Sequence, residues 1–181
     1  MTNFNRPSMT KQEETHWQTV LTHEAGHAVA CLELLGKSAD IVVTKYNVDF
    51  GNYLAKFCCS EFLQTPPCTH AVVFDVMAAG AAAEYKILGI SNSKGFASDL
   101  GKIKTVVRLA PEQVSTVLQQ EQSVDYPRVR ALVQKQAKAL QAIAEAAMHR
   151  VIALFSTGKL QPDELLLSGD CVKELYDRFK I

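Results

Sequence analysis

The chain has 181 residues, of which 48% are hydrophobic and 21% are charged. This length suits one domain with a buried core, and the composition excludes a disordered or fibrous protein. The 19 basic and 19 acidic residues cancel. Because no net charge attracts the chain to a polyanion, we expect no nucleic-acid partner.

The first residues, the apolar segments and the cysteines indicate the cellular compartment. Residues 1–9 are expected to form a flexible tail, and residues 10–181 a single domain. The start, "MTNFNRPSMTKQEET", lacks the apolar stretch of a secretory signal. The most apolar run, "VMAAGAAA", is far shorter than the ~20 residues of a membrane-spanning helix. The five cysteines form no C-x-x-C pair. We therefore expect a cytoplasmic protein without a membrane span.

The first predicted element is a helix that begins after Thr10. Thr10 and Glu13 form a T-x-x-E capping box, and Gly36 is expected to end the helix. One face of this helix is apolar and is expected to be buried. It carries Trp17, Val20, Leu21, Ala25, Ala28 and Leu32.

A small sheet and a second helix are predicted next. The stretches "DIVVTKY" and "NYLAKFCCS" are rich in strand-forming residues, and the glycine in "NVDFG" between them suits a hairpin or a short sheet corner. After the helix-breaking "QTPPC", a helix is expected over residues 69–88 with Gly89 following it. Its centre, "AAGAAAE", consists of small residues that let another helix approach closely.

The rest of the chain is predicted to be helical. Helices are expected from about residue 98 to 110 and over 112–122, and a long or kinked helix over 127–155 with Gly158 beyond it. A last helix from Asp170 should bury an apolar face. The fold class is therefore α+β, predominantly α-helical, with a small β-sheet or hairpin and a C-terminal helical bundle. The residues of that last apolar face are Val172, Leu175, Tyr176 and Phe179.

The segment "THEAGHAVACLELLG" contains the pattern H-E-x-x-H on the first predicted helix. His23 and His27 are one turn apart, so both imidazoles can bind the same metal ion. Glu24 lies off that line, where it can hydrogen-bond a zinc-bound water and act as a general base. The motif predicts a catalytic Zn²⁺ site, against the simpler alternative of two incidental histidines on a helix.

A hydrolytic zinc site needs a third protein ligand, and spacing alone leaves two candidates. Glu84 lies on the second predicted helix, and Asp99 stands at a helix start after a glycine-containing loop. His16 is too far along the helix to share the ion. Glu33 has metzincin spacing but should point away from His27 on a continuous helix. The pair Cys68 and His70, and His149 on the long helix, are more simply read as packing or surface residues.

Three segments together resemble a known family. "HEAGHAVACLELL", "VMAAGAAAEYKILG" and "GFASDLGKIKTVVRLA" are similar, in order and spacing, to the peptidase domain of FtsH-type ATP-dependent zinc proteases. The C-terminal helices are similar too, so the likeness covers nearly all of the chain from residue 10. The resemblance implies that His23, His27 and Asp99 bind zinc, that Glu24 is the catalytic base, and that Glu84 orients a ligand histidine.

The chain also departs from that family. It contains no G-x-x-x-x-G-K-[ST] motif, so the AAA ATPase module is missing, as is a membrane anchor. The family's N-D is Ser98-Asp99 here, and Ala81 replaces an arginine. With these departures, we expect a zinc endopeptidase that cleaves unfolded or flexible polypeptide without ATP, with a homo-oligomer or a separate unfoldase as further partners. The alternatives are a non-catalytic binding or regulatory module with a peptidase fold, and a small-molecule hydrolase.

Overall fold

A computed structural model describes residues 8–45, 53–59, 61, 63, 69–90, 99 and 127–181. These residues form five helices and three short strands, in the order α1, β1, β2, α3, α6, α7, β3, α8. The expected α+β, predominantly helical class is confirmed. The helices predicted over 98–110 and 112–122 lie outside the described residues, except for Asp99.

Helix α1 (Lys11–Leu35) carries the H-E-x-x-H motif and begins and ends as predicted. Thr10 accepts a hydrogen bond from the Glu13 N–H, and the Glu13 carboxylate accepts one from the Thr10 N–H, which completes the capping box. Gly36 ends the helix with a φ of 63°, a conformation that glycine adopts at little cost. The apolar face of α1 is buried in the core, with Leu21, Ala25 and Ala28 at most 1% exposed.

Strands β1 (Ile41–Lys45) and β2 (Tyr53–Phe57) pair antiparallel, which confirms the predicted hairpin partners. A third strand, β3 (Leu165–Leu167), pairs antiparallel with β1 and was not predicted. A run of three leucines fits a helix or a strand equally well, so pairing with β1 decides its conformation. The strand order is β2-β1-β3, which leaves β2 at an edge of this sheet.

Helix α3 (His70–Leu88) packs along α1 and runs in the opposite direction, since His27 contacts Val76 and His23 contacts Glu84. Thr69 caps its start, and Gly89 ends it with a φ of 68°. The expected close approach of another helix at "AAGAAAE" is confirmed. The centre of α3 is almost entirely buried, including Val76, Ala79 and Ala83 at 0% exposure.

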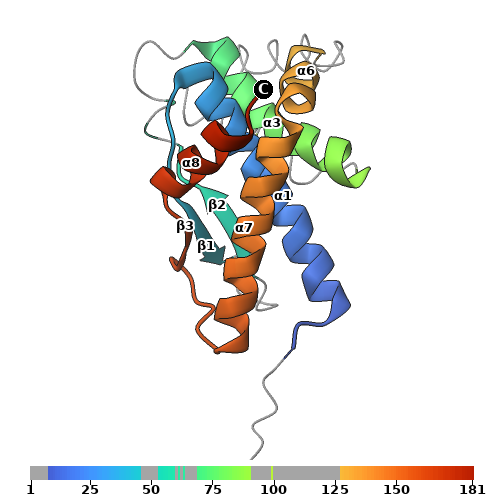
Figure 1. The fold of residues 1–181 in the computed structure, drawn as a ribbon, viewed down its shortest axis with the longest axis vertical. Helices are drawn as coiled ribbons and strands as arrows, with labels where there is room; N and C mark the ends of the chain where they lie inside the picture. Colours follow the sequence, from blue (N-terminus) through green and yellow to red (C-terminus); the bar gives the residue numbers. More distant parts are fainter. Residues whose placement is uncertain are drawn as a thin grey trace, which may run out of the picture.

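The C-terminal half consists of α6 (Pro127–Lys135), α7 (Ala137–Ser156) and α8 (Gly169–Phe179). The predicted long or kinked helix is interrupted at Gln136, which separates α6 from α7. In Figure 1, α7 runs along the long axis, and the strands and α8 lie on one side of it. Val172 and Tyr176 are buried as predicted, but Phe179 is 38% exposed, because it lies in the last turn of α8. None of the described helices is long and apolar enough to cross a membrane.

Candidate metal centre

His23 and His27 lie one turn apart on α1, on the side that faces α3. Their side chains are buried, with relative exposures of 7% and 3% for the two residues. The rings meet edge to face, with centroids 4.6 Å apart and planes at 85°. Burial of a polar ring costs free energy unless its nitrogens have hydrogen-bond partners. The partners of each nitrogen therefore show which nitrogens are available to a metal ion.

The two nitrogens of His27 have different environments. Nδ1 lies 2.7 Å from the carbonyl oxygen of Val76 on α3 and donates to it, which leaves the lone pair on Nε2. Nε2 is buried and makes no hydrogen bond within the described residues, although Asp99 Oδ2 lies 3.3 Å from it. A buried imidazole nitrogen without a hydrogen bond is costly in a folded protein, and a metal ion would satisfy it.

Asp99 approaches both histidines, although it is 76 and 72 residues away from them in sequence. Its Oδ2 lies 2.6 Å from His23 Nε2 and 3.3 Å from His27 Nε2, and the residue is 1% exposed. The candidate ligand atoms of the three residues all lie within 4.8 Å of one another. In tetrahedral zinc sites with bonds of about 2.0–2.1 Å, ligand atoms are about 3.3 Å apart. This buried group could therefore hold a metal ion.

Glu84 on α3 holds the other nitrogen of His23. Its Oε1 lies 2.5 Å from His23 Nδ1, and the residue is 1% exposed. A carboxylate that accepts the Nδ1–H fixes the ring orientation and leaves Nε2 to face the ion. The structure thus brings both carboxylate candidates to the same ring, with Asp99 on the ligand side and Glu84 on the opposite side.

The two carboxylates determine the protonation of His23 in this structure. Burial alone would lower the pKa of His23, but the hydrogen bonds to Asp99 and Glu84 outweigh it and raise the pKa to about 10. Burial likewise opposes ionisation of Asp99, but the two nearby imidazoles hold the pKa of Asp99 well below its usual range. Both shifts favour a charged pair of His23 and Asp99, whose facing atoms lie 2.6 Å apart.

Glu24 is half-buried and points toward the sheet. Its Oε2 accepts a hydrogen bond of 2.7 Å from the backbone N–H of Phe57, at the end of β2. Its other oxygen, Oε1, has no hydrogen bond to the described residues. The carboxylate is therefore fixed beside the two histidines with one oxygen in use, an arrangement that suits a group that takes up a proton.

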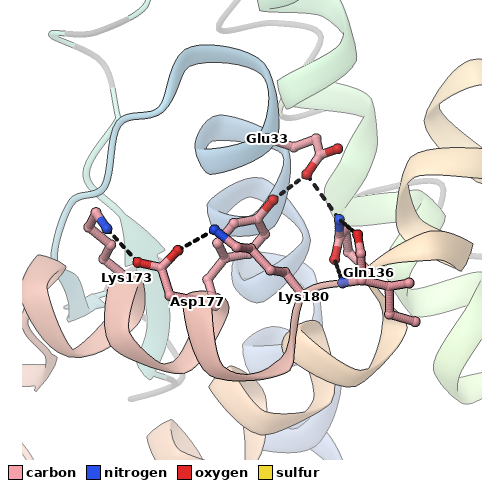
Figure 2. Close-up of polar contacts among 7 residues, drawn as sticks. Glu33, Gln136, Lys173, Asp177 and Lys180 are labelled. Atoms are coloured by element: carbon pink, nitrogen blue, oxygen red, sulfur yellow. Dashed lines mark hydrogen bonds and ion pairs between the residues drawn. The ribbon is translucent and has the colours of Figure 1, made fainter.

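Glu33 has a structural role instead of the metal-binding one that its spacing first suggested. Its carboxylate accepts hydrogen bonds from Lys135, Gln136 and Tyr176, at 2.7 Å from Lys135 and 2.9 Å from Gln136. Figure 2 shows Glu33 on α1 bonded to Gln136 at the α6–α7 junction, next to α8. The prediction that Glu33 points away from His27 agrees with these contacts.

Among the described residues, the candidates His16 and His149 are not part of the metal-binding group. The His16 ring packs edge to face on Trp17, with centroids 6.1 Å apart, and His149 is exposed, as expected. Cys68 and the side chain of His70 lie outside the described residues. Two backbone partners, the Val76 carbonyl and the Phe57 N–H, could not be predicted from the sequence, because a backbone group has no side-chain signature.

The sequence matches no model of a protein family, and no curated protein matches it. The assignment of a function therefore depends on the motif and on the geometry described above.

Proposed function

We propose that this protein is a zinc-dependent endopeptidase that hydrolyses peptide bonds in unfolded or flexible polypeptides, without ATP. One observation carries the proposal: His23, His27 and Asp99 converge in a buried group, and Glu24 follows His23 on the same helix. We also propose that the domain is of the FtsH peptidase type, since the positions of Asp99 and Glu84 agree with the roles that the resemblance implies.

The donor set suits zinc, since two imidazoles and one carboxylate leave a fourth position open. A zinc ion bound there would polarise a peptide carbonyl and lower the pKa of a water molecule toward ~7. Non-haem iron(II) oxygenases use the same three donors. Glu24 favours the hydrolytic alternative, because a carboxylate next to the ligands has a use in moving a proton.

Glu24 would act as the general base through Oε1, while Oε2 keeps its hydrogen bond to Phe57. This bond would hold the carboxylate in place as it takes up and releases the proton. Orienting the carboxylate would therefore add little to the activation free energy. His23 and His27 are oriented separately, by Glu84 and by the Val76 carbonyl. Each proposed reactive group thus has its own fixed support.

The edge of β2 offers a place for an extended substrate. The Cys58 N–H donates to the Asp40 carbonyl at 2.9 Å, so Cys58 and Asp40 form a hydrogen-bonded pair. Because such pairs alternate along an antiparallel ladder, the next pair, Ile41 and Phe57, is not hydrogen-bonded. The backbone groups of Phe57, and by alternation those of Ala55, therefore point away from β1. A peptide that adds to β2 would bind Ala55 through backbone hydrogen bonds, which depend on extended shape more than on sequence.

The test combines a metal assay with a protease assay on the purified protein. We expect about one zinc per chain, digestion of casein, and loss of digestion with a chelator. Glu24→Gln should keep the zinc and reduce turnover by roughly 10²- to 10⁴-fold, the usual contribution of a general base. Proteolysis that survives this substitution would contradict the mechanism, and bound iron instead of zinc would contradict the hydrolytic assignment.

A non-catalytic binding or regulatory module is the second candidate. The observation in its favour is that the Glu24 carboxylate already has a structural partner in Phe57, as a residue retained for packing would. The same assays separate the two candidates. Stoichiometric zinc together with no cleavage of casein or of unstructured peptides would favour the module.

A further inference from the structure

Gly80 lies on α3 directly against the ring of the candidate ligand His23. A Cβ placed on Gly80 would lie 2.6 Å from Nε2 of His23, 2.7 Å from Cε1 and 2.8 Å from Cδ2. Carbon atoms that are not bonded make favourable contacts at about 3.5–4.0 Å, so all three distances are strong overlaps. Any residue other than glycine at this position would displace the ring.

Two hydrogen bonds and one ring contact hold the His23 ring and oppose its movement away from such a side chain. Its Nδ1 is held by Glu84 at 2.5 Å and its Nε2 by Asp99 at 2.6 Å. The His27 ring packs on it edge to face at 4.6 Å. A shift of His23 would therefore break at least one of two buried hydrogen bonds, and it would change the direction of Nε2 relative to Asp99 and His27.

We propose that Gly80 is a positioning residue for the metal centre, because its missing side chain lets the imidazole of His23 lie across the α3 backbone. In this position Nδ1 reaches Glu84, about one helical turn further along α3, and Nε2 faces the other two ligands. The part of this inference that concerns the ion rests on the proposed function. The part that concerns the ring position in the metal-free protein does not.

Gly26, between the two histidines on α1, has a different role. A Cβ there would lie 2.5 Å from the Ala79 carbonyl oxygen and 2.8 Å from the Ala83 Cβ, so it would separate the two helices. Gly26 thus determines the spacing of α1 and α3, whereas Gly80 determines the position of one side chain. This difference allows the two effects to be separated by mutation.

The first experiment is a double-mutant cycle on the metal-free protein, unfolded by urea in the presence of a chelator. Gly80→Ala should lower the urea midpoint when His23 is present. In the His23→Ala background the ring is gone, and the same substitution should leave the midpoint unchanged or raise it, because alanine favours helix over glycine. An equal effect of Gly80→Ala in both backgrounds would overturn the inference.

The second experiment measures metal binding by the full chain. Gly80→Ala should weaken zinc binding by about 10- to 100-fold, the range found when a ligand histidine loses its support, and should alter the visible spectrum of bound Co²⁺. Ala81→Ser is the matched control, because it also adds one heavy atom, on the next residue of α3, which is half-buried. Zinc affinity and a Co²⁺ spectrum unchanged in Gly80→Ala would overturn the inference.

The two experiments distinguish this inference from the proposed function. If the wild-type chain binds no zinc while the cycle shows that Gly80→Ala is harmful only when His23 is present, the proposed function fails and the positioning role of Gly80 stands. If the wild-type chain binds zinc and the cycle shows no coupling between Gly80 and His23, the positioning role fails alone.

Discussion

The carboxylate of Glu24 accepts a hydrogen bond of 2.7 Å from the backbone N–H of Phe57. This contact joins the H-E-x-x-H helix to the edge strand β2, where an extended substrate would bind. The proposed general base and the proposed docking edge are therefore parts of one hydrogen-bonded unit. The backbone N–H groups of Phe57 and Ala55 both point away from β1. Removal of one or the other should consequently have different effects on catalysis.

Removal of the Phe57 N–H alone should lower kcat. Incorporation of phenyllactic acid at position 57 replaces the N–H by an ester oxygen and keeps the buried ring. A hydrogen bond to a charged group contributes about 1.5–3 kcal/mol, so we expect a loss of roughly 10- to 100-fold in kcat with little change in KM. The matched control is lactic acid at position 55, which removes the outward N–H of Ala55 and should mainly raise KM. Identical effects at the two positions would contradict this division of roles.

Glu84→Gln should weaken metal binding, because the neutral amide no longer provides a charged acceptor for the Nδ1–H of His23. Loss of such a partner costs about 10- to 100-fold in metal affinity. Competition with a chromogenic chelator measures the change. Glu145→Gln, on an exposed position of α7, is the control and should bind zinc like the wild type. If Glu84→Gln also binds like the wild type, Glu84 does not orient the ligand.

The stability of the metal-free protein should fall as the pH rises above neutrality. The pKa of His23 is raised from 6.5 to about 10. The stabilisation from its charged form is therefore fully present below pH 6.5 and is lost as the pH rises through about 10. Urea unfolding in a chelator at a series of pH values measures this decline. His23→Ala has no such group and should show a smaller decline, and equal slopes for the two proteins would refute the assignment.

Local signals in the sequence predicted much of the fold. The capping box at Thr10 and the glycines Gly36 and Gly89 define helix ends through contacts within a few residues, so they could be recognised without a structure. Strand β3 could not be recognised in this way. A run of three leucines shows no periodicity that would distinguish a strand from a helix, and its pairing with β1 joins segments more than 120 residues apart.

The candidate site was predictable only in part. His23, Glu24 and His27 follow from one turn of a helix, but spacing alone left the third ligand open between Glu84 and Asp99. The position of Glu84 depends on how closely α3 approaches α1, which follows from the contact of Gly26 with the Ala79 backbone, and the position of the His23 ring depends on its contact with Gly80. The structure brings Asp99 to the ligand side of His23 and Glu84 to the other side. Their roles as ligand and orienting group remain predictions.

The cluster around Glu33 should stabilise the fold without affecting the metal centre. Glu33 on α1 accepts hydrogen bonds from Lys135, Gln136 and Tyr176, so it joins α1 to α8 and to the α6–α7 junction. Figure 2 shows the bond from Gln136. Lys135 and then Tyr176 lower the pKa of Glu33, and burial together with Glu33 raises the pKa of Tyr176. Both shifts indicate a hydrogen bond from the neutral phenol to an ionised carboxylate.

Tyr176→Phe should therefore reduce the free energy of unfolding by about 1.5–3 kcal/mol, the contribution of a hydrogen bond to a charged group. Tyr85→Phe is the control, because Tyr85 is 57% exposed, and it should change stability by less than about 0.5 kcal/mol. Urea unfolding measures both values, and zinc affinity should be unchanged in both variants. Because Glu33 must be ionised to accept the bond, the difference between wild type and Tyr176→Phe should shrink as the pH falls through the lowered pKa of Glu33. A difference that is constant down to low pH would show that the phenol acts through packing instead.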